Sequence, residues 1–122
     1  MTMRGREYLT KSEQYALVYK KGSSWINDLV VMKALPNGLT FSRYGFSVGR
    51  RVGGAVVRNR VKRRLREILY SLPLEPGWDI IFIARPQAAS ASFARLEKSV
   101  HGLLSRAGLL TGEYEEACLG IN

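Results

Sequence analysis

Residues 53–72, GGAVVRNRVKRRLREILYSL, carry the spacing of an amphipathic helix. Apolar side chains recur every three or four positions, at Val57, Val61, Leu65, Ile68 and Leu69. At about 100° per residue these positions form one stripe. The opposite arc is cationic and holds Asn59, Arg60, Lys62, Arg63 and Arg66, with Arg58 and Arg64 at its margins. We predict a helix that packs its apolar stripe on a core, presents its cationic arc to solvent and ends before Pro73.

Segments with strand character lie on both sides of this helix. Trp25–Leu35 and Leu39–Gly49 precede it, and the Pro-Asn-Gly turn between them favours an antiparallel hairpin, with a break near Ser42. Trp78–Ala84 follows it, and its four consecutive apolar residues predict a strand buried on both faces. Because a helix connects the second strand to the third, these two strands could be parallel neighbours.

Two further helices are predicted near the ends of the chain. The first is introduced by residues 10–13, TKSE, where the threonine hydroxyl and the glutamate carboxylate fit a capping box, and it ends near Gly22. Ser90 or Ser92 caps the last helix, which keeps its apolar spacing until Gly108. The order helix, strand, strand, helix, strand, helix predicts a single α/β sandwich. We expect one domain across residues 1–122, with loose ends at 1–8 and 111–122.

The net charge of +9 is concentrated in one part of the chain. Residues 29–66 contain ten lysines and arginines and no aspartate or glutamate. Such a one-sign block is typical of proteins with a polyanionic partner, and nucleic acid is a better candidate than acidic lipid. The chain has no apolar run long enough to span a membrane and no secretory signal in its first ten residues. We therefore expect a cytoplasmic protein.

The residues that could carry chemistry are few. Asp28 and Asp79 are isolated, and the glutamates at 113, 115 and 116 lie on a tail that we interpret as solvated. His101 has no partner at a catalytic spacing, so packing or surface exposure is the better interpretation, and Cys118 is interpreted as an inert thiol. The sequence predicts no catalytic residue and no metal ligand in the chain itself.

The basic helix is the strongest functional signal. Most of its cations are arginines, whose planar guanidinium binds phosphate through two hydrogen bonds and stacks on bases, and this favours RNA contact. Tyr15 and Tyr19 lie four residues apart on the first helix, where they could stack bases. Packing in the core is an equally good interpretation of these two tyrosines.

Five motifs together resemble the protein subunit of bacterial ribonuclease P. The basic segment RNRVKRRLR at 58–66 matches the signature helix of that family, and GFSV at 45–48 and GGAVV at 53–57 stand before it at the family's spacing. Tyr15, Tyr19 and Gly22 are similar to the family's first helix, and residues 79–85, DIIFIAR, are similar to its fourth strand. The resemblance covers residues 9–110.

The resemblance implies a ribosomal-protein-like two-layer α/β sandwich of the α+β class, with a left-handed crossover through the basic helix. It also implies an accessory role, because the catalytic centre of that family lies in an RNA subunit. This RNA uses Mg²⁺, which it mainly holds itself, to remove the 5′ leader of precursor transfer RNA. The implied partners are the catalytic RNA and precursor transfer RNA, with no membrane and no obligate protein partner.

Residue roles follow from the same resemblance. The implied RNA-binding residues are Arg50, Arg51, Arg58, Asn59, Arg60, Lys62, Arg63 and Arg66. The implied cleft for the single-stranded leader is lined by Tyr15, Tyr19, Phe46 and Ser47. The family usually has phenylalanine at the two tyrosine positions, so these hydroxyls could form hydrogen bonds that the family lacks. Met32 stands near the place where some members have another cleft aromatic.

Three other functions are weaker interpretations. A ribosomal or chaperone RNA-binding protein could use the same basic face, but it has no reason to combine the aromatic pair with the Arg-Asn-Arg helix at these spacings. A DNA reader would need base-reading side chains at the start of the helix, where residues 55–57 are apolar. A self-sufficient nuclease would need an acid, a base or metal ligands, which the chain does not offer.

Overall fold

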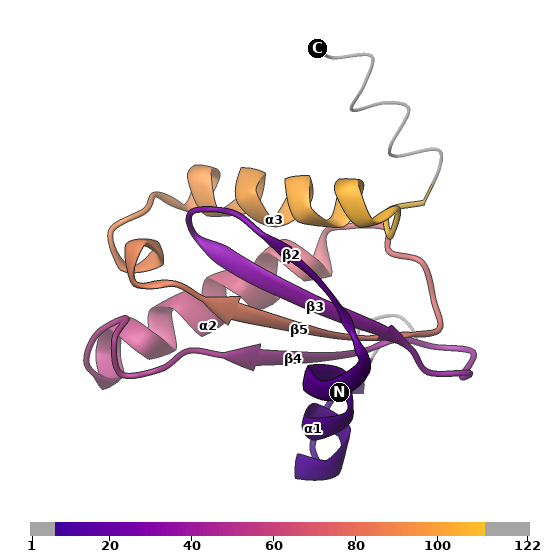
Figure 1. Ribbon diagram of the computed structural model, residues 1–122. Coiled ribbons are helices and arrows are strands. Elements are labelled where there is room, and N and C mark those ends of the chain that lie inside the picture. The colour runs from indigo at the N-terminus through magenta and orange to yellow at the C-terminus, as the bar shows by residue number, and fades with distance from the viewer. Residues whose placement is uncertain (1–6, 112–122) are drawn as a thin grey trace.

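The computed structural model describes residues 7–111 and shows three helices around a five-stranded sheet (Figure 1). The strands are β1 (Glu7–Tyr8), β2 (Ser23–Ile26), β3 (Val30–Pro36), β4 (Arg43–Ser47) and β5 (Trp78–Ala84). The helices are α1 (Ser12–Lys21), α2 (Ala55–Tyr70), a short 3₁₀ helix η1 (Pro86–Ala89) and α3 (Phe93–Ala107). The strand order is β1-β4-β5-β3-β2, with α1 on one face of the sheet and α2 and α3 on the other. The predicted α+β sandwich is confirmed.

Strand β5 occupies the centre of the sheet. It pairs in parallel with β4 and antiparallel with β3, so the strands on either side of the basic helix are parallel neighbours, as we expected. Ile80 and Phe82 belong to the core under α2 and α3, whereas Ile81 belongs to a smaller core under α1. Burial on both faces explains why this strand is continuously apolar. The left-handed sense of the crossover stays a prediction from the resemblance.

The predicted hairpin between residues 25–35 and 39–49 is wrong, because β5 lies between β3 and β4. The hairpin of this sheet instead joins β2 to β3, one turn earlier in the chain. Its turn is stabilised by Asn27, whose Oδ1 accepts hydrogen bonds from the backbone N–H groups of Leu29 (3.1 Å) and Val30 (2.9 Å). Gly38 does form a turn with a positive φ of 72°, but the chain then leaves β3 and continues to β4 on the far side of β5.

The helix ends show which capping predictions hold. In α3, Ser92 Oγ accepts from the backbone N–H of Arg95 at 3.1 Å, and Gly108 closes the helix with a φ of 70°. In α1 the cap differs from the prediction, because Gln14 rather than Glu13 folds back. Its Oε1 accepts from the backbone N–H groups at 10 and 11, at 3.0 and 3.1 Å.

Residues near the amino terminus are more ordered than predicted. Glu7 and Tyr8 were expected in a loose end, but they form β1 alongside the start of β4. The stripe predicted for the basic helix is confirmed, since Val61, Leu65, Ile68 and Leu69 of α2 are all buried. No helix in residues 7–111 is long and apolar enough to cross a bilayer.

Candidate nucleic-acid interface

The cationic arc of α2 faces solvent, as its spacing predicted. Asn59, Arg63 and Arg66 are exposed, while Arg58 and Lys62 are half-buried at the border of the apolar stripe. Two ion pairs occur in the described part of the chain, and neither involves a residue of α2. The arginines of this face therefore keep donors and positive charge for an anionic ligand.

Two arginines of α2 are engaged within the protein. Arg60 Nη2 donates to the carbonyl oxygen of Ala89 at 2.8 Å, and Arg64 Nη1 donates to that of Ala91 at 3.1 Å. These bonds hold the segment after β5 against the helix. Arg60 was expected to contact RNA, and the structure adds a docking role for its guanidinium that the spacing of the helix did not indicate.

Arg50 and Arg51 extend the basic surface at the start of α2. Both are exposed in the loop between β4 and α2, where the backbone N–H of Val52 donates to the carbonyl of Gly49 at 3.1 Å. Gly53 brings this loop close to the helix, because an added Cβ would lie 2.9 Å from Cβ of Val57. The two exposed arginines thus lie in a loop that packs closely against the start of α2.

The first helix places Tyr15 directly on the sheet. Its ring lies over Gly45 of β4, where an added Cβ would come within 2.6 Å of the ring. Its hydroxyl donates to the carbonyl oxygen of Leu9 at 3.4 Å. Burial raises the pKa of the Tyr15 phenol, the nearby Tyr19 raises it further, and a hydrogen bond with the Phe46 backbone opposes both. The expectation that a tyrosine hydroxyl here forms hydrogen bonds is confirmed.

Tyr19 is in a different environment from Tyr15. Tyr19 is 42% exposed, so much of its side chain is open to solvent on the same helix. Core packing was an equally good interpretation of both tyrosines, and the structure supports it for Tyr15 but not for Tyr19. Tyr15 packs on the sheet, and Tyr19 is available to stack on a base.

The four residues expected to line one cleft do not all lie on the same face of the sheet. In the register of β4 and β5, Ser47 pairs with Ile83, on the face that carries α1. Phe46 pairs with Phe82 and packs against the core on the opposite face, with 6.2 Å between the ring centroids. Alternate residues of a strand point to opposite faces, so adjacent positions cannot line the same surface of the sheet.

The same alternation corrects the expectation for Met32. Its side chain is fully buried in the core under α2 and α3, opposite Phe82 in the register of β3 and β5. Met32 therefore does not extend a surface on the α1 side. Its neighbour Lys33 faces that side, is half-buried and donates from Nζ to Ser24 Oγ at 2.8 Å.

Further half-buried residues on the α1 face were missed by the sequence analysis. Val31 and Ile83 face each other across β3 and β5, and Ile26 of β2, which is exposed, adjoins Val31. With Lys33 and Ser47 they make a sheet surface with apolar and cationic groups beside α1. Burial alternates along β3, but its sequence, VVMKALP, marks the half-buried face only at Lys33, so Lys33 was the one signal that could have located this surface.

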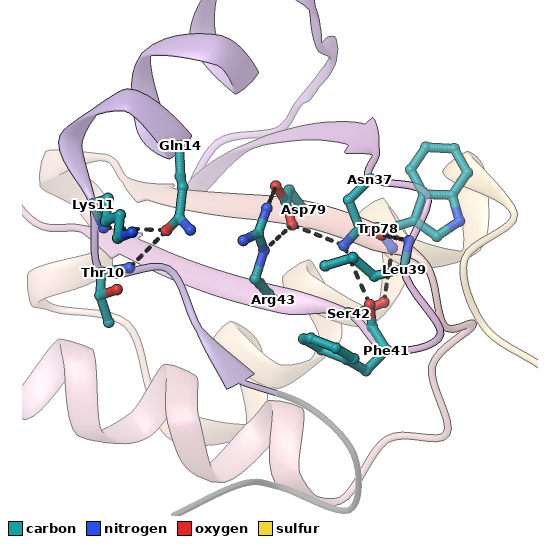
Figure 2. A network of polar contacts seen from close by, with 10 residues as sticks. All are labelled: Thr10, Lys11, Gln14, Asn37, Leu39, Phe41, Ser42, Arg43, Trp78 and Asp79. Carbon is teal, nitrogen blue, oxygen red and sulfur yellow. Dashed lines mark hydrogen bonds and ion pairs between the residues drawn. The ribbon is translucent and has the colours of Figure 1, made fainter.

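A largely buried polar network joins β4 and β5 at the end where both strands begin (Figure 2). Arg43 donates from Nε and Nη2 to the carboxylate of Asp79, at 2.8 and 2.6 Å, and Asn37 Nδ2 donates to the same group at 2.9 Å. Hydrogen bonding to Asp79 raises the pKa of Arg43, partial burial opposes this, and the charges of Asp79 and Glu7 add to it. Ser42 Oγ accepts from the backbone N–H of Trp78 at 3.0 Å. The network fixes the register that sets Gly45 under Tyr15.

Within residues 7–111 the remaining chemistry-bearing residues do not form a second site. No group of three or more His, Cys, Asp or Glu side chains that could hold a metal ion occurs between residues 7 and 111. His101 is half-buried in α3. The glutamates at 113, 115 and 116 and the thiol at 118 lie outside the described residues.

Comparison with known proteins defines the family. The family model described as "Ribonuclease P" matches residues 3–108. The chain belongs to the ribonuclease P protein family. A ribonuclease P protein component from Dehalococcoides mccartyi strain CBDB1 is 49% identical over 114 residues, which is 93% of this chain and 95% of that protein. One from Roseiflexus castenholzii is 44% identical over 111 residues, covering 88% of this chain and 91% of that protein.

Solved ribonuclease P proteins share the fold. The protein from Staphylococcus aureus, solved at 2.0 Å, aligns with a TM-score of 0.77 and 31% identity over 88% of this chain and 98% of its own. The protein from Thermotoga maritima aligns with a TM-score of 0.74 and 32% identity over 83% of this chain and 97% of its own. The resemblance carried by the Arg-Asn-Arg helix and its flanking motifs is therefore confirmed.

Proposed function

We propose that this chain acts as the protein subunit of ribonuclease P, which assists removal of the 5′ leader from precursor transfer RNA. In this role it binds the catalytic RNA and the single-stranded leader. Membership of the ribonuclease P protein family supports the role. The observation that carries it is that one small domain has two surfaces suited to RNA. One is the cationic outer face of α2, and the other is the partly aromatic α1 side of the sheet.

The outer face of α2 suits the catalytic RNA. Arg63 and Arg66 are exposed without carboxylate partners among the described residues, and Arg50 and Arg51 continue this face. Structured RNA is bound mostly through its phosphates, which arginine contacts with two parallel hydrogen bonds. We assign to this surface Arg50, Arg51, Arg58, Asn59, Lys62, Arg63 and Arg66, with Arg60 at its edge.

The α1 side of the sheet suits a single strand. Tyr19 offers an exposed ring, Lys33 offers a cation, and Val31 and Ile83 offer a half-buried apolar floor. Single-stranded RNA is bound by stacking its bases on aromatic rings beside positive charges that follow its backbone. We assign the leader to this surface, with Ser47 at its margin.

Phosphodiester hydrolysis is assigned to the RNA subunit. Mg²⁺, held mainly by that RNA, would polarise the scissile phosphate and activate the attacking water. The side chains of this protein bind and orient the two RNAs. Helix α2 holds the catalytic RNA, and the α1 side of the sheet holds the leader. This division fits a protein that works in the cytoplasm, where transfer RNA precursors are processed.

Truncating Tyr19 is expected to weaken leader binding selectively. Tyr19→Ala removes the exposed ring and, because stacking contributes about 1–3 kcal/mol per base, should reduce affinity for a leader-bearing precursor about tenfold. Affinity for the same transfer RNA without a leader should be unchanged. Fluorescence titration of both RNAs into the complex with the catalytic RNA measures the ratio.

Leu17→Ala is the matched control, since Leu17 is on the same helix and is 46% exposed. Loss of an apolar side chain that cannot stack should leave the ratio of the two affinities at its wild-type value. An unchanged ratio in Tyr19→Ala would contradict the assignment of the leader to this side of the sheet.

A further inference from the structure

The edge of β4 is only partly covered by β1. The two strands pair at residues 7–8 and 43–44, and the last bond between the segments runs from the backbone N–H of Leu9 to the carbonyl of Tyr44, at 2.7 Å. Beyond this bond the chain turns into α1, while β4 continues to Phe46 and Ser47. The edge of β4 is therefore not paired with β1 at its next position.

The hydroxyl of Tyr15 lies at this edge. It donates to the carbonyl of Leu9 at 3.4 Å, and its oxygen lies against β4, 2.6 Å from where a Cβ on Gly45 would stand. There the phenol is close enough to the Phe46 backbone for that backbone to lower its pKa. One side-chain oxygen thus joins the end of the amino-terminal segment to the edge of β4. The lowering effect of Phe46 on the phenol pKa identifies its backbone N–H as the interacting group, since a donated N–H favours the phenolate.

Gly45 makes this contact possible. The Cε1, Cζ and Oη atoms of Tyr15 would all lie within 2.7 Å of a Cβ at position 45. Any other residue would have to displace either the ring or the strand. The ring is thus seated on the strand backbone, and its hydroxyl reaches the strand edge.

Little else fixes α1 to the sheet. Of the ten residues in this helix only Val18 is fully buried, and it packs with Leu9 and Ile81 in the smaller of the two cores. With so small an apolar contact, one seated ring and its hydrogen bonds are a large share of what holds the helix in place.

We propose that Tyr15 is a positioning residue of the leader surface: its hydroxyl fastens α1 to the edge of β4 and so sets where Tyr19 stands above the sheet. The two tyrosines then have different functions, since Tyr19 stacks on RNA and Tyr15 positions the helix. This inference rests on the proposed leader-binding function. A phenylalanine at position 15 could fill the space over Gly45 but could not make the hydroxyl bridge.

The test uses Tyr15→Phe in the full chain. Without RNA, amide hydrogen exchange at Phe46 should become faster than in the wild type, because its N–H has lost an acceptor. In complex with the catalytic RNA, affinity for a leader-bearing precursor should fall about two- to tenfold, the range expected for one net hydrogen bond. Affinity for the leaderless transfer RNA should not change. Tyr70→Phe, which removes the hydroxyl of an exposed tyrosine on α2, should match the wild type in exchange at Phe46 and in both affinities.

A double-substitution cycle tests whether the ring and the glycine act together. Gly45→Ala should reduce leader-dependent affinity more than tenfold by displacing the ring. The same substitution made in Tyr15→Ala should cost little further, because the obstructing ring is absent. Gly49→Ala is the matched glycine control, since a Cβ there meets no atom within 4 Å.

The outcomes separate this inference from the function on which it rests. Wild-type exchange at Phe46 together with wild-type leader affinity in Tyr15→Phe would overturn the positioning role, even if Tyr19→Ala still weakened leader binding. Additive effects of Gly45→Ala and Tyr15→Ala would also overturn it. A wild-type protein with equal affinity for precursors with and without a leader would overturn both the inference and the proposed leader function.

Discussion

Reversing Arg63 and Arg66 to glutamate is expected to weaken binding of the catalytic RNA by roughly 100-fold at about 0.1 M salt. Both side chains are exposed on the outer face of α2, and no carboxylate in the described residues neutralises them. Each phosphate contact contributes about 0.7–0.9 logarithmic units of affinity at that salt concentration, and the new carboxylates add repulsion. The melting temperature should change by no more than a few degrees, since neither residue belongs to the buried stripe.

The salt dependence gives a second measure of the same change. A plot of log affinity against log salt concentration should become shallower by about 1.5 in the double variant, because two phosphate contacts are lost. The matched control reverses Lys98 and Arg106, two exposed cations of α3, for the same change in net charge. Affinity in the control should stay within about threefold of the wild type. An equal loss in both variants would show diffuse attraction in place of a defined contact with α2.

Replacing Asp79 with alanine is expected to lower the melting temperature by about 10 °C or more. The Asp79 side chain is 4% exposed and accepts from Arg43 and Asn37, so its removal leaves a partly buried guanidinium without its acceptor. The half-buried Asn37 amide also loses one of its two acceptors and keeps the carbonyl of Phe41. Breaking a buried pair in this way costs about 3 kcal/mol, which at this chain length corresponds to such a shift. Thermal unfolding followed by circular dichroism measures it.

The chain contains its own control for this prediction. Asp28 pairs with Arg95, but both side chains are more than half exposed, so Asp28→Ala should change stability by about 0.5 kcal/mol or less. The double variant Arg43→Met with Asp79→Leu should recover much of the lost stability, because it removes the unpaired charge as well. If Asp79→Ala and Asp28→Ala had the same effect, the network in Figure 2 would not be what fixes β4 against β5.

Local patterns predicted most of the elements of this fold. The stripe of α2, the buried run of β5 and the Ser92 and Gly108 caps of α3 all depend on residues close together in sequence. The prediction of which strand pairs with β3 failed because the sequence has two turn signals in that region. The Asn27 turn and the Gly38 turn have similar chemistry, and only the insertion of β5 between β3 and β4, a long-range event, selects between them.

In the candidate site, too, local patterns were predictable from the sequence and long-range contacts were not. Helical periodicity placed Arg63 and Arg66 on the exposed face of α2, but it could not show that Arg60 docks on Ala89, nearly thirty residues later. The alternation of side chains along a strand is a local rule, and it is sufficient to assign Phe46 and Ser47 to opposite faces of the sheet. The bridge from Tyr15 to β4 was beyond prediction, since it depends on how closely a helix approaches a glycine in a strand that is distant in sequence.

The central claim is that this chain supports an RNA enzyme without catalysing the reaction itself. The most direct measurement is cleavage of a 5′-extended precursor transfer RNA at low Mg²⁺ concentration, with the protein alone, a bacterial catalytic RNA alone, and both together. We expect efficient cleavage at the mature 5′ end only in the mixture. Cleavage by the purified protein alone, or binding of the RNA without any stimulation of cleavage, would contradict the claim.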